Sequence, residues 1–337
     1  MPSRPGRRDQ EEAAARWDRR IARAHLLADT YPASAYLLTF YASLAERQKA
    51  LAEQAVADEG VSPPAGDAAK GSDPLLGPDD LDLALTAIPG FLRWLQHEAV
   101  APVSLAEAAA GLRDLDMVEW QRILRSRISA PIARPETPTP ASVLFVAEAV
   151  LQPLAERSAH RRQRASQVAR GAADGFVPPA APEFVPGTEP EGPIDAESLM
   201  AATPSRATTS EGRTVNLALS ACRWCGDQPL VGVLREEGHG ARRALVCARC
   251  LIARDYLRVV CPACGEETFD ALPIYTAEQF AHVRIDACDT CKHYLKTIDG
   301  TKDGLADPVV DDLASVALDL WAREQGYVRT RQNLLRT

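Results

Sequence analysis

The first 221 residues of this 337-residue chain contain no cysteine, and all eight cysteines lie between Cys222 and Cys291. Long apolar runs are also missing: SVLFVAEAV is interrupted by Glu148, so we expect no bilayer-spanning segment. No apolar stretch follows the N-terminal arginines, so we expect neither a secretory nor a twin-arginine signal and predict a cytoplasmic protein. In that reducing compartment, paired cysteines favour metal binding or redox chemistry over structural disulfides.

Excess positive charge and local catalytic motifs are absent as well. The formal charge of −8 gives no general attraction to nucleic acid or to anionic lipid. The sequence has no Gly-rich phosphate loop, no G-x-S-x-G and no H-E-x-x-H, which argues against an enzyme. We therefore expect a binding or assembly function rather than catalysis.

The cysteine-free part of the chain has helical character. Apolar residues recur every three to four positions from Tyr36 to Leu51, and Thr139-Pro140 is typical of the start of a long helix. Seven prolines between Pro178 and Pro204 indicate an extended linker. We predict an α-helical domain over 1–177 and a Pro-rich linker over 178–218.

After the linker, short β-like runs predict strands. They are PLVGVLR, RALVC, YLRVV, ALPIY, HVRI and YLKTI. A single helix is expected from Pro308 to Gly326, with Asp307 as its cap and an apolar stripe from Val309 to Trp321. Asp311 and Asp312 fit its first turn, where carboxylates interact favourably with the helix dipole. An exposed acidic pair could also bind a basic segment of a partner.

The cysteines form four CxxC pairs with none left over. Twenty-one residues separate the first pair from the second and twenty-three separate the third from the fourth, which indicates a tandem duplication. Four thiolates per unit suit a tetrahedral structural zinc or a mononuclear iron of the rubredoxin type. We predict two metal sites with these ligands: Cys222, Cys225, Cys247 and Cys250, then Cys261, Cys264, Cys288 and Cys291.

Other interpretations of the cysteines remain open at this point. Pairs could alternate between the two sites, and a single CxxC could form a thioredoxin-like redox motif, although four pairs favour metal. A nucleic-acid-binding zinc ribbon is a further alternative. Residues 220–300 carry ten Lys/Arg against eleven Asp/Glu, which argues against it but leaves a local arginine patch. That patch would consist of Arg242, Arg243, Arg249, Arg254 and Arg258.

Several segments near the cysteines resemble the formate dehydrogenase accessory proteins of the FdhE type. The similarity covers about the C-terminal third of the chain. It lies in CRWCGDQPLVGVL, LVCARC, YLRVVCPACG, CDTCKHYLKTID and DPVVDDLASVALD. The resemblance implies a non-catalytic maturation factor for molybdenum- or tungsten-containing formate dehydrogenases, with two mononuclear metal ions, iron favoured and zinc the alternative. Its partner would be the catalytic subunit of that enzyme, and a homodimer is left open.

The fold class that we expect is therefore α+β. An N-terminal α-helical domain is followed by two tandem rubredoxin-like or zinc-ribbon-like subdomains with four cysteines each, over 219–255 and 256–305, and by a C-terminal helix and tail over 306–337. A rubredoxin-like electron-transfer protein is the main alternative function. Tyr294-Leu295-Lys296 is expected to be an alternating strand or a partner-contact edge. His293 could donate to a sulfur, and Trp224 could shield the first site or anchor a partner.

Overall fold

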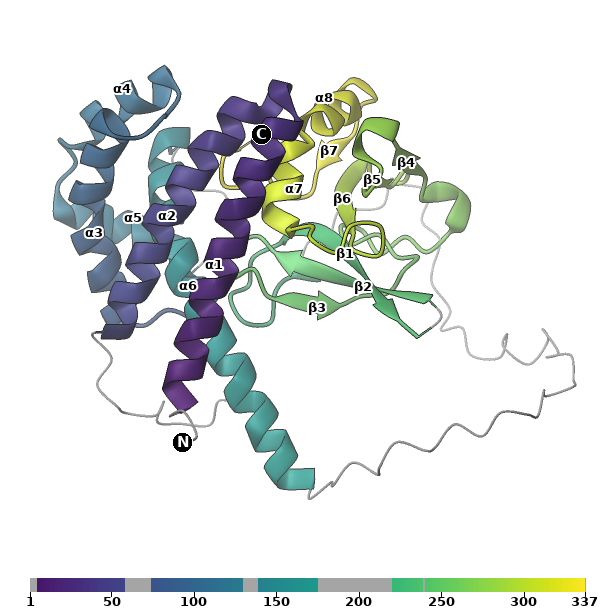
Figure 1. The fold of residues 1–337 in the computed structure, drawn as a ribbon, viewed down its shortest axis with the longest axis horizontal. Helices are drawn as coiled ribbons and strands as arrows, with labels where there is room; N and C mark the ends of the chain where they lie inside the picture. The colour runs from purple at the N-terminus through teal and green to yellow at the C-terminus, as the bar shows by residue number, and fades with distance from the viewer. Residues whose placement is uncertain (1–4, 58–73, 130–138, 175–219, 239, 337) are drawn as a thin grey trace, which may run out of the picture.

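The computed structural model describes residues 5–57, 74–129, 139–174, 220–238 and 240–336. Its first half is helical, as Figure 1 shows. The helices are α1 (Pro5–Thr30), α2 (Ala35–Ala57), α3 (Pro78–His97), α4 (Val103–Leu112), α5 (Met117–Ser129) and α6 (Ala141–Asp174), and the 3-10 turn η1 (Pro32–Ser34) precedes α2. The expected linker 178–218 lies outside the described residues.

The helical half is held together by a buried aromatic cluster. Phe40 of α2, Phe91 and Trp94 of α3, and Phe145 of α6 have ring centroids 5.3–6.2 Å apart. Each of these side chains is at most 5% exposed, so three helices contribute to one apolar core. Among the described helices, none is long and apolar enough to cross a membrane.

The strands form one seven-stranded sheet in the order β3-β2-β1-β6-β5-β4, with β7 beside β6. They are β1 (Pro229–Glu237), β2 (Gly240–Cys247), β3 (Ala253–Asp255), β4 (Ile274–Thr276), β5 (Val283–Ala287), β6 (His293–Asp299) and β7 (Val328–Arg329). Strands β1–β3 form a first hairpin unit and β4–β6 a second. Parallel pairing of β1 with β6 joins these two hairpin units, and Gly232 lies opposite Thr297 there. A Cβ at Gly232 would collide with the Thr297 hydroxyl, so this close approach requires glycine.

Two features of the expected β region are wrong. The segment YLRVV is not a strand: β3 ends at Asp255, and Leu257 and Val259 are 69% and 45% exposed. The strand β6 does not alternate between buried and exposed residues, because Tyr294 to Ile298 are all buried. It lies between β1 and β5, so Tyr294-Leu295-Lys296 is not an edge for a partner.

The C-terminal helix is two helices, α7 (Pro308–Ala314) and α8 (Val316–Glu324). Asp307 accepts from the backbone N–H groups of Val309 and Val310, so the predicted cap is confirmed. The helix breaks at Ser315, where Lys296 Nζ donates to the carbonyls of Asp312 and Ser315. The apolar stripe predicted from Val309 to Trp321 is therefore not buried along its whole length: beyond the break, Leu320 is 54% exposed.

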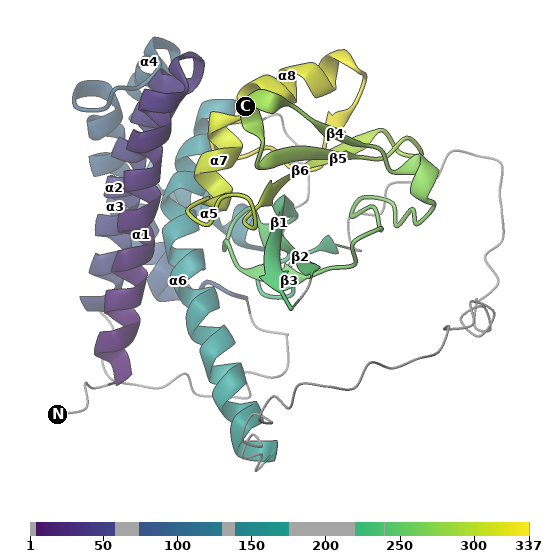
Figure 2. The same cartoon turned by 45° about the vertical axis from the view of Figure 1, so that its right-hand side comes forward.

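Helix α7 connects the two halves of the molecule. It contacts α1 and α2 on one side and β1 and β6 on the other. Ser34, just before α2, donates to the carbonyl of Ala314 at 2.8 Å. In Figure 2, α6 lies between α1 and the sheet. Apolar residues of the helices and of the sheet therefore share one continuous core, and the expected α+β fold class is confirmed. The 3-10 turns η4 (Phe269–Ala271) and η5 (Glu278–Phe280) complete the second hairpin unit.

Candidate metal centres

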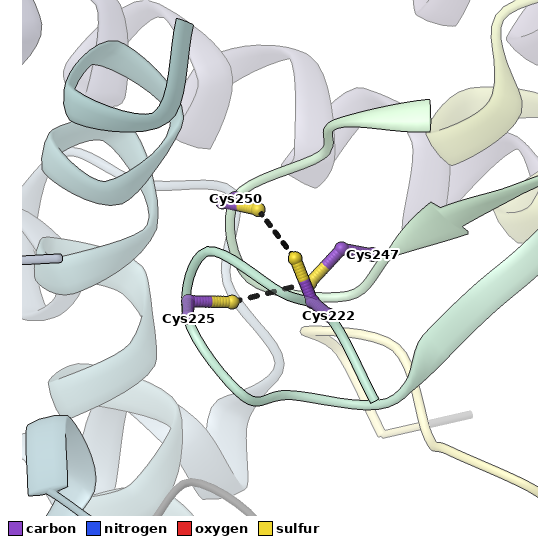
Figure 3. A group of neighbouring side chains, drawn as sticks. All are labelled: Cys222, Cys225, Cys247 and Cys250. Atoms are coloured by element: carbon purple, nitrogen blue, oxygen red, sulfur yellow. Dashed lines mark hydrogen bonds between the residues drawn. The ribbon is translucent and has the colours of Figure 1, made fainter. Parts of the chain in front are cut away.

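The first cysteine set lies where β2 ends against the helices. Figure 3 shows the four sulfurs pointing toward a common centre. The Sγ atoms of Cys222 and Cys250 are 3.5 Å apart, and those of Cys225 and Cys247 are 3.3 Å apart. A metal ion bonded to four tetrahedral sulfurs at about 2.3 Å separates them by about 3.8 Å. The spacing therefore fits a single tetrahedral ion.

The second set repeats this geometry. The Sγ atoms of Cys261 and Cys291 are 3.7 Å apart, as are those of Cys264 and Cys288. Within each set every sulfur lies within 4.8 Å of the others. Each set is therefore made of consecutive CxxC pairs, as the spacing predicts, and the alternating arrangement is wrong. That the eight thiols bind metal stays a prediction.

Four similar turns position the sulfurs. After each first cysteine, the backbone N–H four residues on donates to its carbonyl, as from Gly226 to Cys222 and from Gly265 to Cys261. Gly226 and Gly265 have φ of +72° and +73°, a conformation that glycine adopts without steric cost. At the same place in the other two turns stand Leu251 and Lys292, with φ of +54° and +57°. Non-glycine residues held there indicate strain imposed by the geometry of the sites.

Without metal, the thiols of each set share protons through hydrogen bonds. Donation from neighbouring thiols lowers the pKa of Cys222 in the first set and of Cys288 in the second. Burial and hydrogen bonding to neighbouring thiols raise the pKa of Cys247 and Cys250, and hydrogen bonding with Cys288 raises the pKa of Cys261 to about 12. Each set thus favours one thiolate at neutral pH, which is the form that captures a metal ion.

A buried carboxylate holds the second set in shape. Glu266 accepts from the backbone N–H groups of Glu267 and Thr268, and its second oxygen accepts from Thr290 Oγ1 at 2.9 Å. These contacts lower the pKa of Glu266 to about 2, the Thr268 backbone bond being the largest cause. Because Thr290 lies between Cys288 and Cys291, Glu266 ties the two turns of this set together.

An arginine inside the first set binds the helical half. Arg249, between Cys247 and Cys250, is 2% exposed and donates to Glu148 of α6 at 2.9 and 3.2 Å. It also donates to the carbonyl of Arg127 at 2.6 Å. Burial alone would raise the pKa of Glu148, but the charges of Arg249, Arg127 and Arg331 outweigh it and lower the pKa to about 2.

The arginine patch considered for nucleic acid does not form. Arg249 pairs with Glu148 as described, and Arg243 is 3% exposed and pairs with Asp286 at 3.0 Å. Arg242 is exposed but is paired with Glu237 at 3.0 Å. Because Arg243 and Arg249 are buried in ion pairs, they cannot contribute to an exposed phosphate-binding surface formed by all five arginines.

A buried ion network lies beneath β6, and sequence reasoning missed it. Lys296, Asp312 and Asp319 are all fully buried, and Lys296 Nζ lies 2.9 Å from Asp312 and 2.5 Å from Asp319. Arg329 bonds both carboxylates. Two cations balance two anions in this network, as burial of charge requires. Asp312 is therefore neither an exposed partner contact nor a residue placed only for the helix dipole.

The neighbouring Asp311 is likewise buried. It accepts from Arg23 of α1 at 2.6 and 3.1 Å and lies 2.6 Å from His282 Nε2. Lys296 of the motif YLK and Asp312 of the motif DDLAS thus meet in the fold. Considering these two oppositely charged motifs as a pair could have predicted this contact from the sequence. His293 contacts the carbonyl of Cys291 at 2.9 Å through Nδ1 rather than a sulfur.

The fold and the cysteine geometry define a class of protein: an α+β protein with a helical half, one sheet made of two joined hairpin units, and two tandem four-cysteine sets. Residues 259–336 match the family described as FdhE, C-terminal domain. This chain is 40% identical to the FdhE homolog of Aquifex aeolicus over 116 residues, which cover 34% of this chain and 41% of that protein. It is 37% identical to the FdhE homolog of Pseudomonas aeruginosa over 123 residues, covering 34% and 38%.

The fold agrees over a longer range than the sequence. The crystal structure of the FdhE protein from Pseudomonas aeruginosa matches with a TM-score of 0.56 at 23% identity, over 95% of both chains. The sequence matches span about two fifths of the length of the curated relatives. The resemblance of this chain to the FdhE family is thus confirmed, and residues 259–336 match the FdhE C-terminal domain.

Proposed function

We propose that this protein is an accessory factor that binds the catalytic subunit of a molybdenum- or tungsten-containing formate dehydrogenase and assists its active assembly. The observation that supports this most is the presence of two complete four-cysteine sets in a chain whose residues 259–336, which include the second set, match the FdhE C-terminal domain. The proposal assigns the protein to the cytoplasm and gives it no catalytic residues.

The eight cysteines would hold two mononuclear metal ions, with iron favoured by the family resemblance. The metal–thiolate site would replace the hydrophobic core that each small unit lacks, so metal binding would be coupled to folding. The chemistry of the donor set accepts zinc equally well. We propose that the domain boundaries are those expected from the sequence, with the two units sharing one sheet.

The test is metal analysis with an optical spectrum on protein purified without oxygen, alone and with the catalytic subunit. We expect two iron ions per chain, thiolate-to-iron charge-transfer bands and a stable complex with the subunit. An Arg93→Glu variant, exposed on α3, serves as a control that should keep both metal and complex. Failure to form a complex with metal-loaded protein would overturn the accessory function.

Electron transfer is the second candidate, because rubredoxin-type iron can cycle between two oxidation states. It requires a reversible one-electron reduction of the iron-loaded protein, with electrons passed on to the partner. Two zinc ions and a colourless protein would remove this candidate while leaving the assembly function in place. A complex with the subunit in that zinc form would then favour a holding role.

A further inference from the structure

Two adjoining hollows lie between the helical half and the sheet, beside the first cysteine set. They have volumes of about 290 and 600 Å³ and share Gln163, Ile252 and Ala253 in their walls. The smaller lies against α1, α6 and the start of α7, and the larger includes Cys222 and Trp224. Residues of α1, α6, β2 and β3 line these hollows. Hollows of this size at a domain junction suit a small organic ligand.

Positive charge collects in these hollows although the chain as a whole carries −8. Three carboxylates lie in their walls, and each already has a cation: Glu156 is 3.2 Å from Arg20, Asp255 is 2.9 Å from Arg242, and Asp307 is 3.7 Å from Arg20. The arginines that line the hollows are Arg16, Arg19, Arg20, Arg223, Arg235 and Arg254.

Several of these arginines have no acceptor of their own. Within the described part of the chain, no carboxylate pairs with Arg19, Arg223 or Arg235, and Arg19 and Arg235 are exposed. Burial and Arg16 lower the pKa of His160 to about 4, so this imidazole is neutral at pH 7 and adds no charge. The hollows therefore carry a local surplus of positive charge, which suits an anionic ligand.

The larger hollow adds an aromatic wall. Trp224 packs beside the apolar Ile252, and the guanidinium of Arg223 lies 4.7 Å from its ring centroid. Among the described residues, the indole Nε1 of Trp224 and Nη2 of Arg254 are buried donors without a hydrogen-bond partner. Unpaired buried donors are rare in folded proteins and commonly mark a missing acceptor.

We propose that these joined hollows bind a nucleoside diphosphate. The phosphates lie among Arg16, Arg19 and Arg235 in the smaller hollow, and the planar base lies against Trp224 in the larger one. Arginine suits this ligand because its planar fork bonds phosphate oxygens in pairs. An acidic protein segment would use the charge but would place no planar group against Trp224 in the larger hollow. This inference is independent of the proposed function.

The test is calorimetric titration of the metal-loaded full chain with ADP, GDP, adenosine and inorganic pyrophosphate. We expect both nucleotides to bind, pyrophosphate to bind more weakly and adenosine not to bind measurably. The double variant Arg19→Glu/Arg235→Glu should weaken nucleotide binding by about tenfold or more, since it reverses two charges that contact phosphate. Both residues are exposed, so the fold should be unaffected.

The matched control is Arg93→Glu/Arg113→Glu, which reverses two exposed arginines away from the hollows and should leave the affinity unchanged. Equal weakening by both double variants would reduce the effect to net charge and overturn the site. Absence of binding by both nucleotides and pyrophosphate would overturn it too. Binding of a poly-glutamate peptide that nucleotides fail to displace would instead assign the surface to a protein partner and refute the ligand class.

Discussion

The two cysteine sets have nearly the same turns but different surroundings. Cysteines of the first set belong to the core that the helices and the sheet share, and Arg249 joins that set to α6. The second set forms a separate small cluster of Cys261, Ala263, Cys264 and Cys288. The exposed side chains of Phe269 and Ile274 lie beside it. The same four-cysteine motif thus joins the helical half to the sheet in one case and lies beside exposed apolar side chains in the other.

Removal of one cysteine from each set should separate these roles most strongly. Cys250→Ala should release the first ion and loosen the junction with the helices, whereas Cys291→Ala should release only the second ion. Structural zinc sites in small domains contribute on the order of 10 kcal/mol, so either loss is large. We expect the Cys250 variant to lose cooperative unfolding of the whole chain, measured by calorimetry, and the Cys291 variant to keep it. Full metal content in either variant contradicts the assignment of ligands.

The buried ion network links Lys296 of β6 and Arg329 of β7 to Asp312 of α7 and Asp319 of α8. Lys296→Met leaves two buried carboxylates with Arg329 as their remaining cation and should cost about 3–5 kcal/mol in the free energy of unfolding. Lys292→Met is the matched control, since Lys292 is largely exposed and its pair with Asp289 contributes about 0–1 kcal/mol. Urea unfolding of both variants measures the difference. Equal costs would mean that the network contributes nothing beyond a surface pair.

The junction at the first set should also be sensitive to acid. Because folding lowers the pKa of Glu148 from 4.5 to about 2, its contribution is fully present above pH 4.5 and is lost as pH falls toward 2. That contribution is about 3 kcal/mol, and Glu148→Gln should remove it together with its pH dependence. Glu107→Gln, exposed on α4, is the control. An unchanged slope of stability against pH between 4.5 and 2 in Glu148→Gln would disprove the assignment.

The sequence predicted the parts of this molecule that depend on local spacing. The CxxC pairs and the cap at Asp307 each need only neighbours along the chain. The roles of Asp312 and Lys296 were missed because their partners come from distant segments and because charged residues are seldom fully buried. The break of the C-terminal helix at Ser315 was missed for the same reason. It depends on Lys296 of β6, which is distant in sequence and donates to the carbonyl of Ser315.

The smallest expected effect tests whether the second unit really faces outward. Phe269 in η4 is 76% exposed, whereas Phe280 in η5 is 4% exposed and packs on Tyr31 of the helical half with ring centroids 5.0 Å apart. Phe269→Ala should change the free energy of unfolding by no more than about 0.5 kcal/mol, as for other exposed side chains. Phe280→Ala should cost about 3–5 kcal/mol by leaving a cavity. A cost above about 1.5 kcal/mol for Phe269→Ala that depends on protein concentration would instead mean that a second copy covers this side chain in solution.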